Sequence, residues 1–303
     1  MKKIILEKIC RYFQLGKLIN WKPLPGGSLH SSFKITTSKE KFVIKELNPL
    51  IPNIPKKFEK TQIISEKFFQ NGIPAVCAVS KNSHILYKSE KFNYLVFPYI
   101  SGKNYYPDTL SIQQAKKIGS LLATMHKIKL NIPKTPQSES YEFYDENLRS
   151  PFLSQKQKKI ILSLHQKCLT MKPLSFKKLV ISHRDLTPQN VIWKNPETPY
   201  IIDWEYAGLI HPSVELFSTA FNWSINKKYK FLKELFFSVI KGYQSITIID
   251  DTSISDVLSQ MIKTWMTWIN FNLNRLSDPR SQYEINHTLN CLNVILKTKV
   301  DLN

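Results

Sequence analysis

The sequence has few arginines, few acidic residues and no long apolar run. Only five of its 43 basic residues are arginine, and against 23 acidic residues this leaves a formal net charge of +20. The lysines are spread along the chain without a long block. Because recognition of base edges and nucleic-acid phosphates favours the planar guanidinium of arginine, we interpret the charge as a lysine-rich solvated surface. The composition therefore predicts no nucleic-acid partner.

The sequence also gives no sign of a cysteine-based site or of a membrane segment. The four cysteines are scattered without a metal-type spacing, a pattern typical of reduced thiols in a cytosolic protein. No apolar segment approaches the length of a membrane span, and Glu7, Lys8 and Arg11 interrupt the apolar start too early for a signal peptide. We expect a cytoplasmic protein without a membrane partner. Its 303 residues and 42% apolar content suffice for one large or two small packed domains.

The residues that indicate a chemical activity lie between residues 179 and 205. Three short apolar runs of β type lie there, at 179–181, 191–193 and 200–202. Each run leads into or out of polar residues, so strand ends present them. These polar residues are His183, Asp185, Asn190 and Asp203.

The types and spacings of these residues suit the transfer of a phosphoryl group. Such a reaction mainly requires two oxygens held in line and charge neutralised by Mg²⁺. We assign Asp185 as the carboxylate that accepts the hydroxyl proton and His183 as a brace that holds the loop by hydrogen bonding. Asn190 and Asp203 would supply the hard oxygen ligands that Mg²⁺ prefers. The alternative is that Asp185 and Asn190 are ordinary turn formers and that Asp203 caps a helix.

The stretch from His183 to Asp203 resembles the small-molecule kinases with a protein-kinase-like fold. This superfamily includes aminoglycoside phosphotransferases, choline and ethanolamine kinases, and thiamine kinase. Asp203 is followed by Trp204-Glu205 instead of Phe-Gly, and no Ala-Pro-Glu sequence follows. Both departures argue against a protein kinase.

The resemblance implies an α+β fold of two lobes and the cofactors ATP and Mg²⁺. An N-terminal lobe, an antiparallel sheet with one main helix, would cover residues 1–97 and bind the nucleotide. Residues 98–102 would link the lobes. A larger, mostly helical lobe would cover residues 103–303, with the catalytic loop and the acceptor site. The lysine-rich surface would help to attract ATP.

A glycine pair lies at the tip of an expected hairpin near the N-terminus. Gly26 and Gly27 let backbone N–H groups approach phosphate oxygens, and Ser28 adds a hydroxyl donor. The family's phosphate-covering loop resembles this stretch, although an Asn is common where His30 or Ser31 stands here. The alternative is a plain hairpin turn.

Lys45 follows an apolar triplet on the next expected strand. It matches the family lysine that reaches the α- and β-phosphates. Such a lysine needs a carboxylate to orient it. The helix expected over 56–71 offers Glu59 and Glu66, and the position of its exit turn favours Glu59. The alternative is that Lys45 is an exposed strand lysine.

The run from Phe97 to Gly102 resembles the interlobe linker of the family, where the adenine lies against backbone. Pro98 has no N–H group but keeps its carbonyl. In the family register the Pro98 carbonyl accepts from the adenine amino group, and the Ile100 N–H donates to the ring. Phe97, Pro98 and Ile100 are therefore the predicted adenine contacts.

The sequence after Asp203 resembles the choline kinase and thiamine kinase branches more than the drug-modifying ones. A cationic acceptor would suit aromatic rings together with a carboxylate. The alternative is that the aromatic stripe on a C-terminal helix belongs to the core. The predicted acceptor-binding residues are Glu205, Tyr206, Trp223, Trp265 and Trp268.

Apolar periodicity predicts the remaining elements. Helices are expected at residues 3–15, 111–128 and 155–170 and from Ser213 onward, strands at 75–79, 84–87 and 94–97, and a loop or insertion at 131–154. Glu215 is expected to anchor the catalytic loop by hydrogen bonding. His126 matches a position that the family usually fills with histidine, and a packed or capping histidine is the alternative.

We therefore expect an enzyme that transfers the γ-phosphoryl group of ATP to the hydroxyl of a small cationic metabolite. Thiamine and choline are the first acceptors to test. One alternative is an aminoglycoside phosphotransferase. The other is a non-catalytic nucleotide-binding or nucleic-acid-binding protein on the same scaffold.

Overall fold

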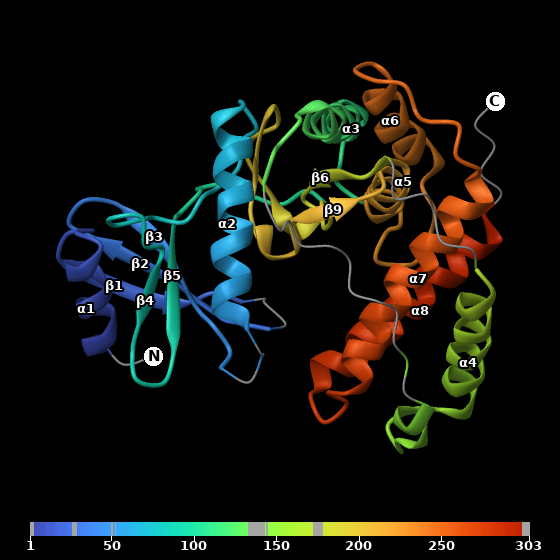
Figure 1. Ribbon diagram of the computed structural model, residues 1–303, viewed down its shortest axis with the longest axis horizontal. Coiled ribbons are helices and arrows are strands. Elements are labelled where there is room, and N and C mark those ends of the chain that lie inside the picture. The colour runs from blue at the N-terminus through green and yellow to red at the C-terminus, as the bar shows by residue number, and fades with distance from the viewer. Residues whose placement is uncertain are drawn as a thin grey trace. The chain divides into compact units, whose positions relative to one another are not determined.

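The protein divides into two compact units, and each is described by itself (Figure 1). The structure is a computed structural model that describes residues 3–25, 29–49, 51, 53–132, 143, 145–171 and 178–298. The first unit comprises Met1–Asn104, Leu130–Pro136 and Asn190–Ala207. The second comprises Tyr105–Lys129, Gln137–Gln189 and Gly208–Asn303. The hairpin that carries Asp203 thus belongs with the N-terminal residues, although a boundary at 98–102 was predicted to separate them.

The first unit is built on a five-stranded antiparallel sheet with the order β1-β2-β3-β5-β4. Alternation along its strands explains the two faces of the sheet: Phe33, Ile35 and Thr37 are buried, and the residues between them are more exposed. The strands are β1 (Leu18–Pro23), β2 (Ser31–Thr37), β3 (Lys41–Glu46), β4 (Leu86–Lys88) and β5 (Asn93–Pro98).

One helix packs on each face of this sheet. Helix α1 (Lys3–Tyr12) buries its apolar stripe in a cluster that includes Tyr94 and Val96 of β5. Helix α2 (Ile54–Gln70) packs in a cluster that includes Leu95. Because successive side chains of a strand point to opposite faces, the two helices cover opposite sides. The helices predicted at 3–15 and 56–71 are both present.

A short hairpin completes the first unit. Strands β7 (Val191–Asn195) and β8 (Thr198–Ile201) pair antiparallel. The predicted strand at 75–79 is wrong, because that segment forms only a bridge from Ala75 to Ile201. Its backbone forms hydrogen bonds to two different strands. The Val76 N–H donates to Ile201 O of β8 at 2.8 Å, and the Val79 N–H donates to Val96 O of β5 at 2.7 Å. The segment therefore connects the hairpin to the sheet.

The second unit is mostly helical around a two-stranded sheet. Its strands, β6 (Val180–Ser182) and β9 (Gly208–Ile210), pair antiparallel. Helices α4, α7 and α8 share an apolar core cluster that includes Ile161, Met266 and Ile285. The helices are α3 (Ile112–Lys127), α4 (Gln155–Thr170), α5 (Pro212–Asn222), α6 (Lys233–Gln244), α7 (Ile254–Leu273) and α8 (Pro279–Lys297). Of the predicted 131–154 loop, residues 133–142 and 144 lie outside the described residues, and Asp145–Arg149 forms a short 3₁₀ helix.

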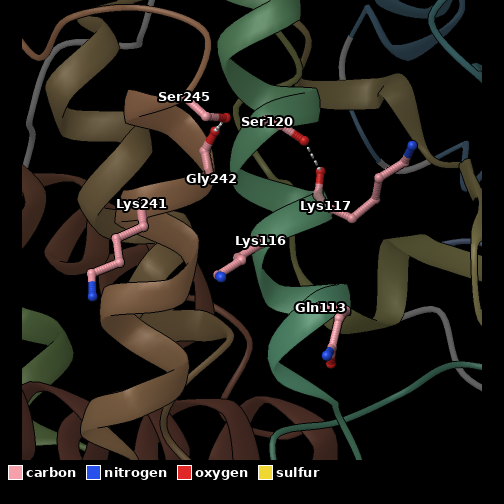
Figure 2. A pocket seen from close by; sticks show the side chains of 7 residues that line it. All are labelled: Gln113, Lys116, Lys117, Ser120, Lys241, Gly242 and Ser245. Carbon is pink, nitrogen blue, oxygen red and sulfur yellow. Dashed lines mark hydrogen bonds between the residues drawn. The ribbon is translucent and has the colours of Figure 1, made fainter.

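Helices α3 and α6 cross at two glycines. A β-carbon on Gly119 would lie 1.9 Å from Val239 O, and one on Gly242 would lie 2.0 Å from Lys116 O. The contact therefore requires residues without a side chain at both positions. Beside the crossing, lysines and polar side chains line a hollow of about 350 Å³ (Figure 2). None of the predicted site residues lines it. Within the part of the chain that the structure describes, no helix is both long and apolar enough to span a membrane.

Candidate active site

The predicted machinery is distributed over both units, and the catalytic loop lies in the second. His183 follows β6, is 0% exposed, and its Nδ1 accepts the Asp185 N–H at 3.2 Å. Arg184 has a φ of 68°, a left-handed conformation that is strained for a residue with a side chain. Its N–H donates to Glu215 Oε1 at 2.6 Å. The loop that presents Asp185 is thus held from both sides, as expected for His183 and Glu215.

Glu215 belongs to a buried chain of polar groups. Its Oε2 lies 2.9 Å from His126 Nε2, and His126 Nδ1 lies 2.9 Å from the Tyr243 hydroxyl. Burial alone would raise the pKa of Glu215, but the hydrogen bond and charge of His126, with the Arg184 N–H, outweigh it and hold that pKa below its ordinary value. Burial, followed by the charge of Glu215, raises the pKa of Tyr243. Sequence reasoning missed Tyr243, which carries no motif signal.

Trp223 supports the same loop and is not available to a ligand. Its Nε1 donates to Leu186 O at 2.7 Å, and its side chain is 0% exposed. A fully buried indole offers no face to an acceptor. The acceptor-binding role predicted for Trp223 is therefore corrected to a structural one, directly behind the residue that follows Asp185.

The other predicted aromatic residues of the second unit lie on α7. Trp265 is partly buried and packs against the core shared by α4, α7 and α8. Trp268 is also partly buried and stacks on Phe271, with ring centroids 5.4 Å apart. The guanidinium of Arg275 lies 5.3 Å from the Phe271 ring centre. The cation–π partner of Phe271 is thus a residue of the chain itself. Trp265 and Trp268 stay predicted acceptor contacts.

In the first unit, Lys45 and Asp203 form an ion pair. Lys45 Nζ lies 2.7 Å from Asp203 Oδ1, and the two side chains are 13% and 39% exposed. Burial alone would lower the pKa of Lys45, but the charges of Asp203 and Glu205 outweigh it and raise that pKa above its ordinary value. This burial and pairing exclude the alternative interpretation, in which Lys45 is an exposed strand lysine.

The β7–β8 hairpin brings Asn190 and Asp203 together at its open end. Asn190 O accepts the Ile202 N–H at 2.9 Å, so the residue before β7 lies beside the residues after β8. An amide and a carboxylate are hard oxygen donors of the kind that Mg²⁺ binds together with water and nucleotide phosphates. Among the described residues, no three His, Cys, Asp or Glu side chains form a separate metal group. The donor set fits the predicted metal, for which Asn190 and Asp203 stay the predicted ligands.

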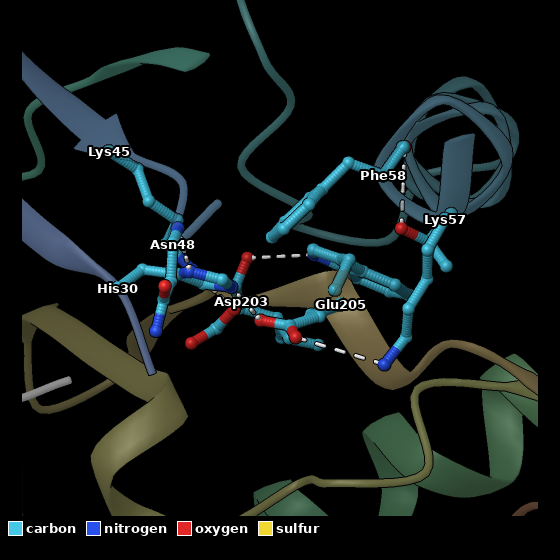
Figure 3. Close-up of polar contacts among 10 residues, drawn as sticks. His30, Lys45, Asn48, Lys57, Phe58, Asp203 and Glu205 are labelled. Carbon is cyan, nitrogen blue, oxygen red and sulfur yellow. Dashed lines mark hydrogen bonds and ion pairs between the residues drawn. The ribbon is translucent and has the colours of Figure 1, made fainter. Parts of the chain in front are cut away.

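Glu205 points into the first unit (Figure 3). It is 4% exposed, and its carboxylate oxygens lie 3.3 Å from His30 Nε2 and 3.7 Å from Lys57 Nζ. Lys57 Nζ also lies 4.1 Å from the centre of the Tyr206 ring. A buried carboxylate with these partners is not presented to a substrate. The geometry therefore contradicts the acceptor-binding role predicted for Glu205. The Tyr206 ring contacts a lysine of the chain itself.

The glutamates predicted to orient Lys45 do not pair with it. Glu59 is exposed and Glu66 is partly buried on α2. The α2 residue that lies beside Lys45 is Phe58, whose ring centre is 5.3 Å from Nζ. Of the described carboxylates, the one paired with Lys45 is that of Asp203. The predicted Lys45–Glu59 pair is thus corrected, because the helix turns an aromatic ring toward the lysine.

The predicted adenine contacts lie at the end of β5. Phe97 is partly buried against the α2 side of the sheet, and the Tyr99 N–H donates to Lys41 O at 3.0 Å. Because backbone groups alternate along a strand, the Pro98 carbonyl points away from β3, and Ile100 lies two residues beyond the end of β5. This orientation suits the predicted hydrogen bonds, which stay predictions. Gly26, Gly27 and Ser28 of the predicted phosphate loop lie outside the described residues.

A braced His-Arg-Asp loop and a lysine–aspartate pair on an antiparallel sheet define the class of kinase-like phosphotransferases. The chain belongs to the phosphotransferase enzyme family, whose model matches residues 20–246. This confirms the predicted class, a kinase that uses ATP and a small-molecule hydroxyl acceptor. No curated protein matches the chain.

Solved structures confirm the predicted α+β protein-kinase-like fold. A spectinomycin phosphotransferase superposes with a TM-score of 0.75 at 16% identity, over 98% of each chain. The choline kinase of Cryptosporidium parvum gives 0.64 at 13% identity, over 98% of this chain and 96% of that one. The choline kinase LicA of Streptococcus pneumoniae gives 0.61 at 16% identity, over 96% and 98%. At these identities the likeness concerns the fold alone.

Proposed function

We propose that the protein transfers the γ-phosphoryl group of ATP, with Mg²⁺, to the hydroxyl of a small cationic metabolite. Choline and thiamine are the first candidates. The observation that carries the proposal is the loop of Asp185, which Glu215 and His183 hold in a strained conformation beside a second anchored residue, Leu186. A backbone fixed in this way supports a residue whose position matters to the reaction.

The proposal gives each of the predicted site residues named below one role. Asp185 accepts the proton of the acceptor hydroxyl as its oxygen attacks phosphorus. Lys45 would hold phosphate oxygens, and Asn190 and Asp203 would hold the metal. When bound, ATP would supply the transferred group, and Mg²⁺ would neutralise the charge that develops on it. Glu215 keeps the loop in place without contact with the substrate.

The test is an ATP-consumption screen with thiamine, choline, ethanolamine, spectinomycin and kanamycin as acceptors. We expect turnover with thiamine or choline. Asp185→Asn should lower kcat by about 10²- to 10⁴-fold, the usual share of a general base, and leave ADP affinity within twofold. An Asp185→Asn variant with undiminished turnover would reject the assigned base.

An antibiotic phosphotransferase is the second candidate. It is favoured by the similarity to the spectinomycin phosphotransferase, which extends over 98% of both chains. Phosphorylation of the antibiotics alone in the screen would establish this candidate and reject the metabolite proposal.

A further inference from the structure

The β7–β8 hairpin, which carries both predicted metal ligands, is bound along both of its outer edges. On the β8 edge the Ile201 N–H donates to Pro74 O at 2.8 Å, and Ile201 O accepts the Val76 N–H at 2.8 Å. On the β7 edge the partners come from residues 102–104, where the predicted linker ends. Because an isolated two-stranded hairpin is at best marginally stable, these edge contacts fix where the metal ligands lie within the first unit.

Trp193, in the middle of β7, pairs with the backbone of this linker end. The Lys103 N–H donates to Trp193 O at 3.0 Å, and the Trp193 N–H donates to Lys103 O at 2.8 Å, as in an antiparallel ladder. The approach is close, because a β-carbon on Gly102 would lie 2.4 Å from Trp193 O. The pairing thus requires a residue without a side chain at position 102.

Asn104 makes the contact of this linker end that lies nearest to the metal ligands. Its side-chain Nδ2 donates to Val191 O at 2.9 Å. Val191 is 0% exposed and directly follows Asn190, whose own carbonyl accepts the Ile202 N–H at 2.9 Å. Successive carbonyls of a strand point to opposite edges, so Val191 O faces away from β8 and needs a partner outside the hairpin. Asn104 supplies that partner from a half-buried position.

We propose that Asn104 is a positioning residue for Mg²⁺, because it fixes the backbone beside Asn190 and thereby the spacing of the metal ligands from the adenine contacts. This inference rests on the proposed function, in which Asn190 and Asp203 hold the metal and the Pro98 carbonyl holds the adenine. One bound nucleotide would have to reach both places at once. The hydrogen bonds between the linker end and β7 join these places into one piece of backbone.

The coordination chemistry of Mg²⁺ makes such positioning important. The ion requires nearly ideal octahedral geometry, so a small displacement of one ligand weakens its binding. The predicted contacts of Lys45 and of the linker with the nucleotide do not pass through Val191. Loss of the Asn104 amide should therefore weaken the part of nucleotide binding that depends on the metal and leave the rest unchanged.

The experiment measures the Kd of ADP by calorimetry in EDTA and again in Mg²⁺, and the quantity of interest is the ratio of the two. Asn104→Ala should lower this Mg²⁺ enhancement about three- to tenfold and change the Kd in EDTA less than twofold. Asn190→Ala, which removes a predicted ligand, should lower it further. The double variant should show a less than additive effect, because Asn104 acts through Asn190. Ser101→Ala, an exposed neighbour in the linker, is the matched control and should keep the full enhancement.

The Mg²⁺ enhancement separates positioning of the metal from support of the fold. If Asn104 only stabilises the linker, Asn104→Ala will lower the unfolding midpoint or weaken ADP binding equally in both buffers. An unchanged enhancement in that variant therefore overturns the proposal. Full additivity with Asn190→Ala also overturns it, because the two residues would then act independently.

A second variant keeps the proposal testable if Asn104→Ala does not fold, as judged by its unfolding midpoint. Asn104→Asp keeps the size of the side chain and replaces the amide donor with an acceptor, so the bond to Val191 O is lost. Its added negative charge alone would favour Mg²⁺. A lowered enhancement in this variant supports positioning, and an unchanged or raised one overturns it.

Two outcomes separate this inference from the proposed function. If the wild type binds no ADP and phosphorylates no acceptor in the screen, the proposed function fails, and the inference fails with it. If the wild type turns over and shows the Mg²⁺ enhancement, but Asn104→Ala keeps that enhancement in full, only the inference is rejected.

Discussion

Single residues of the second unit show how a strained loop is stabilised. Arg184 has a left-handed backbone, and its N–H is bonded to Glu215 at 2.6 Å. Glu215 in turn depends on His126 and, through it, on Tyr243. The position of Asp185 thus rests on a buried carboxylate that does not need to touch a substrate.

Glu215→Ala should therefore destabilise the protein strongly. The change leaves His126 and the Arg184 N–H without their buried partner, a loss that costs about 3–5 kcal/mol. Chemical denaturation followed by tryptophan fluorescence measures the free energy of unfolding. Glu59→Ala, an exposed glutamate on α2, is the matched control and should change stability by less than about 0.5 kcal/mol. Equal effects of the two variants would contradict the anchoring role of Glu215.

The lowered pKa of Glu215 predicts how its contribution depends on pH. A carboxyl whose folded pKa lies below its ordinary value of 4.5 contributes stability that is fully present above that value. The contribution is lost as pH falls through the lowered folded pKa. The difference in unfolding free energy between the wild type and Glu215→Gln should thus shrink as pH falls from about 6 through the lowered folded pKa. Other acids titrate in both proteins and cancel, so parallel curves would refute the assignment.

Residue positions that depend on local sequence were predictable, and those that depend on long-range packing were not. Asn190 and Asp203 flank two short strands, so their proximity follows from the hairpin register. The Lys45–Asp203 pair joins residues 158 positions apart. Lys57 and Tyr243 have no motif of their own and acquire partners only when distant elements pack. The sequence indicated which carboxylates and lysines occur, but not which of them would pair.

At the scale of elements, the α3–α6 crossing depends on the absence of two side chains. Gly119 and Gly242 bring the helix backbones so close that a methyl group at either would meet a carbonyl oxygen at about 2 Å. Helix α3 was predicted from its periodicity, and the structure shows that Ser111 begins it with a capping box to Gln114. The close approach could not be predicted, because periodicity identifies a buried face without its partner.

Gly119→Ala tests this crossing, because close packing and helix propensity predict opposite changes in the free energy of unfolding. In an unpacked helix, replacement of Gly by Ala stabilises by roughly 0.5–1 kcal/mol. At this crossing we expect destabilisation by about 1–3 kcal/mol or more, because the backbones must separate. Urea unfolding measures it, with Lys117→Ala on the exposed side of α3 as the control. A stabilised Gly119→Ala variant would show that the two helices do not pack as closely as described.

The segment at 75–79, predicted to be a strand, shows why hydrogen-bonding patterns were harder to predict than burial. Its apolar residues suit a strand, but Pro74 and the bonds of Val76 and Val79 to two different strands stop a continuous ladder. Its apolar residues pack between the sheet and the hairpin instead. Local pattern thus identified a buried segment correctly and assigned it the wrong hydrogen-bonding pattern.

For the whole molecule, the net charge of +20 acts on every charged ligand. The excess comes from lysines spread along the chain, so it produces a broad positive field. Such a field raises the encounter rate of an anion such as ATP. It does not attract a cationic acceptor, whose binding must depend on local contacts.

Salt should therefore affect the two substrates in different ways. Raising the ionic strength from about 10 mM to about 150 mM shortens the screening length from about 30 Å to about 8 Å. We expect kcat/KM for ATP to fall about three- to tenfold, with kcat changed less than twofold, because only the approach of the anion is weakened. In the same series kcat/KM for choline or thiamine should not fall, which makes the acceptor the internal control. A parallel decrease for both substrates would mean that salt acts on the fold or on the catalytic step, and the broad positive field would then have no role in nucleotide capture.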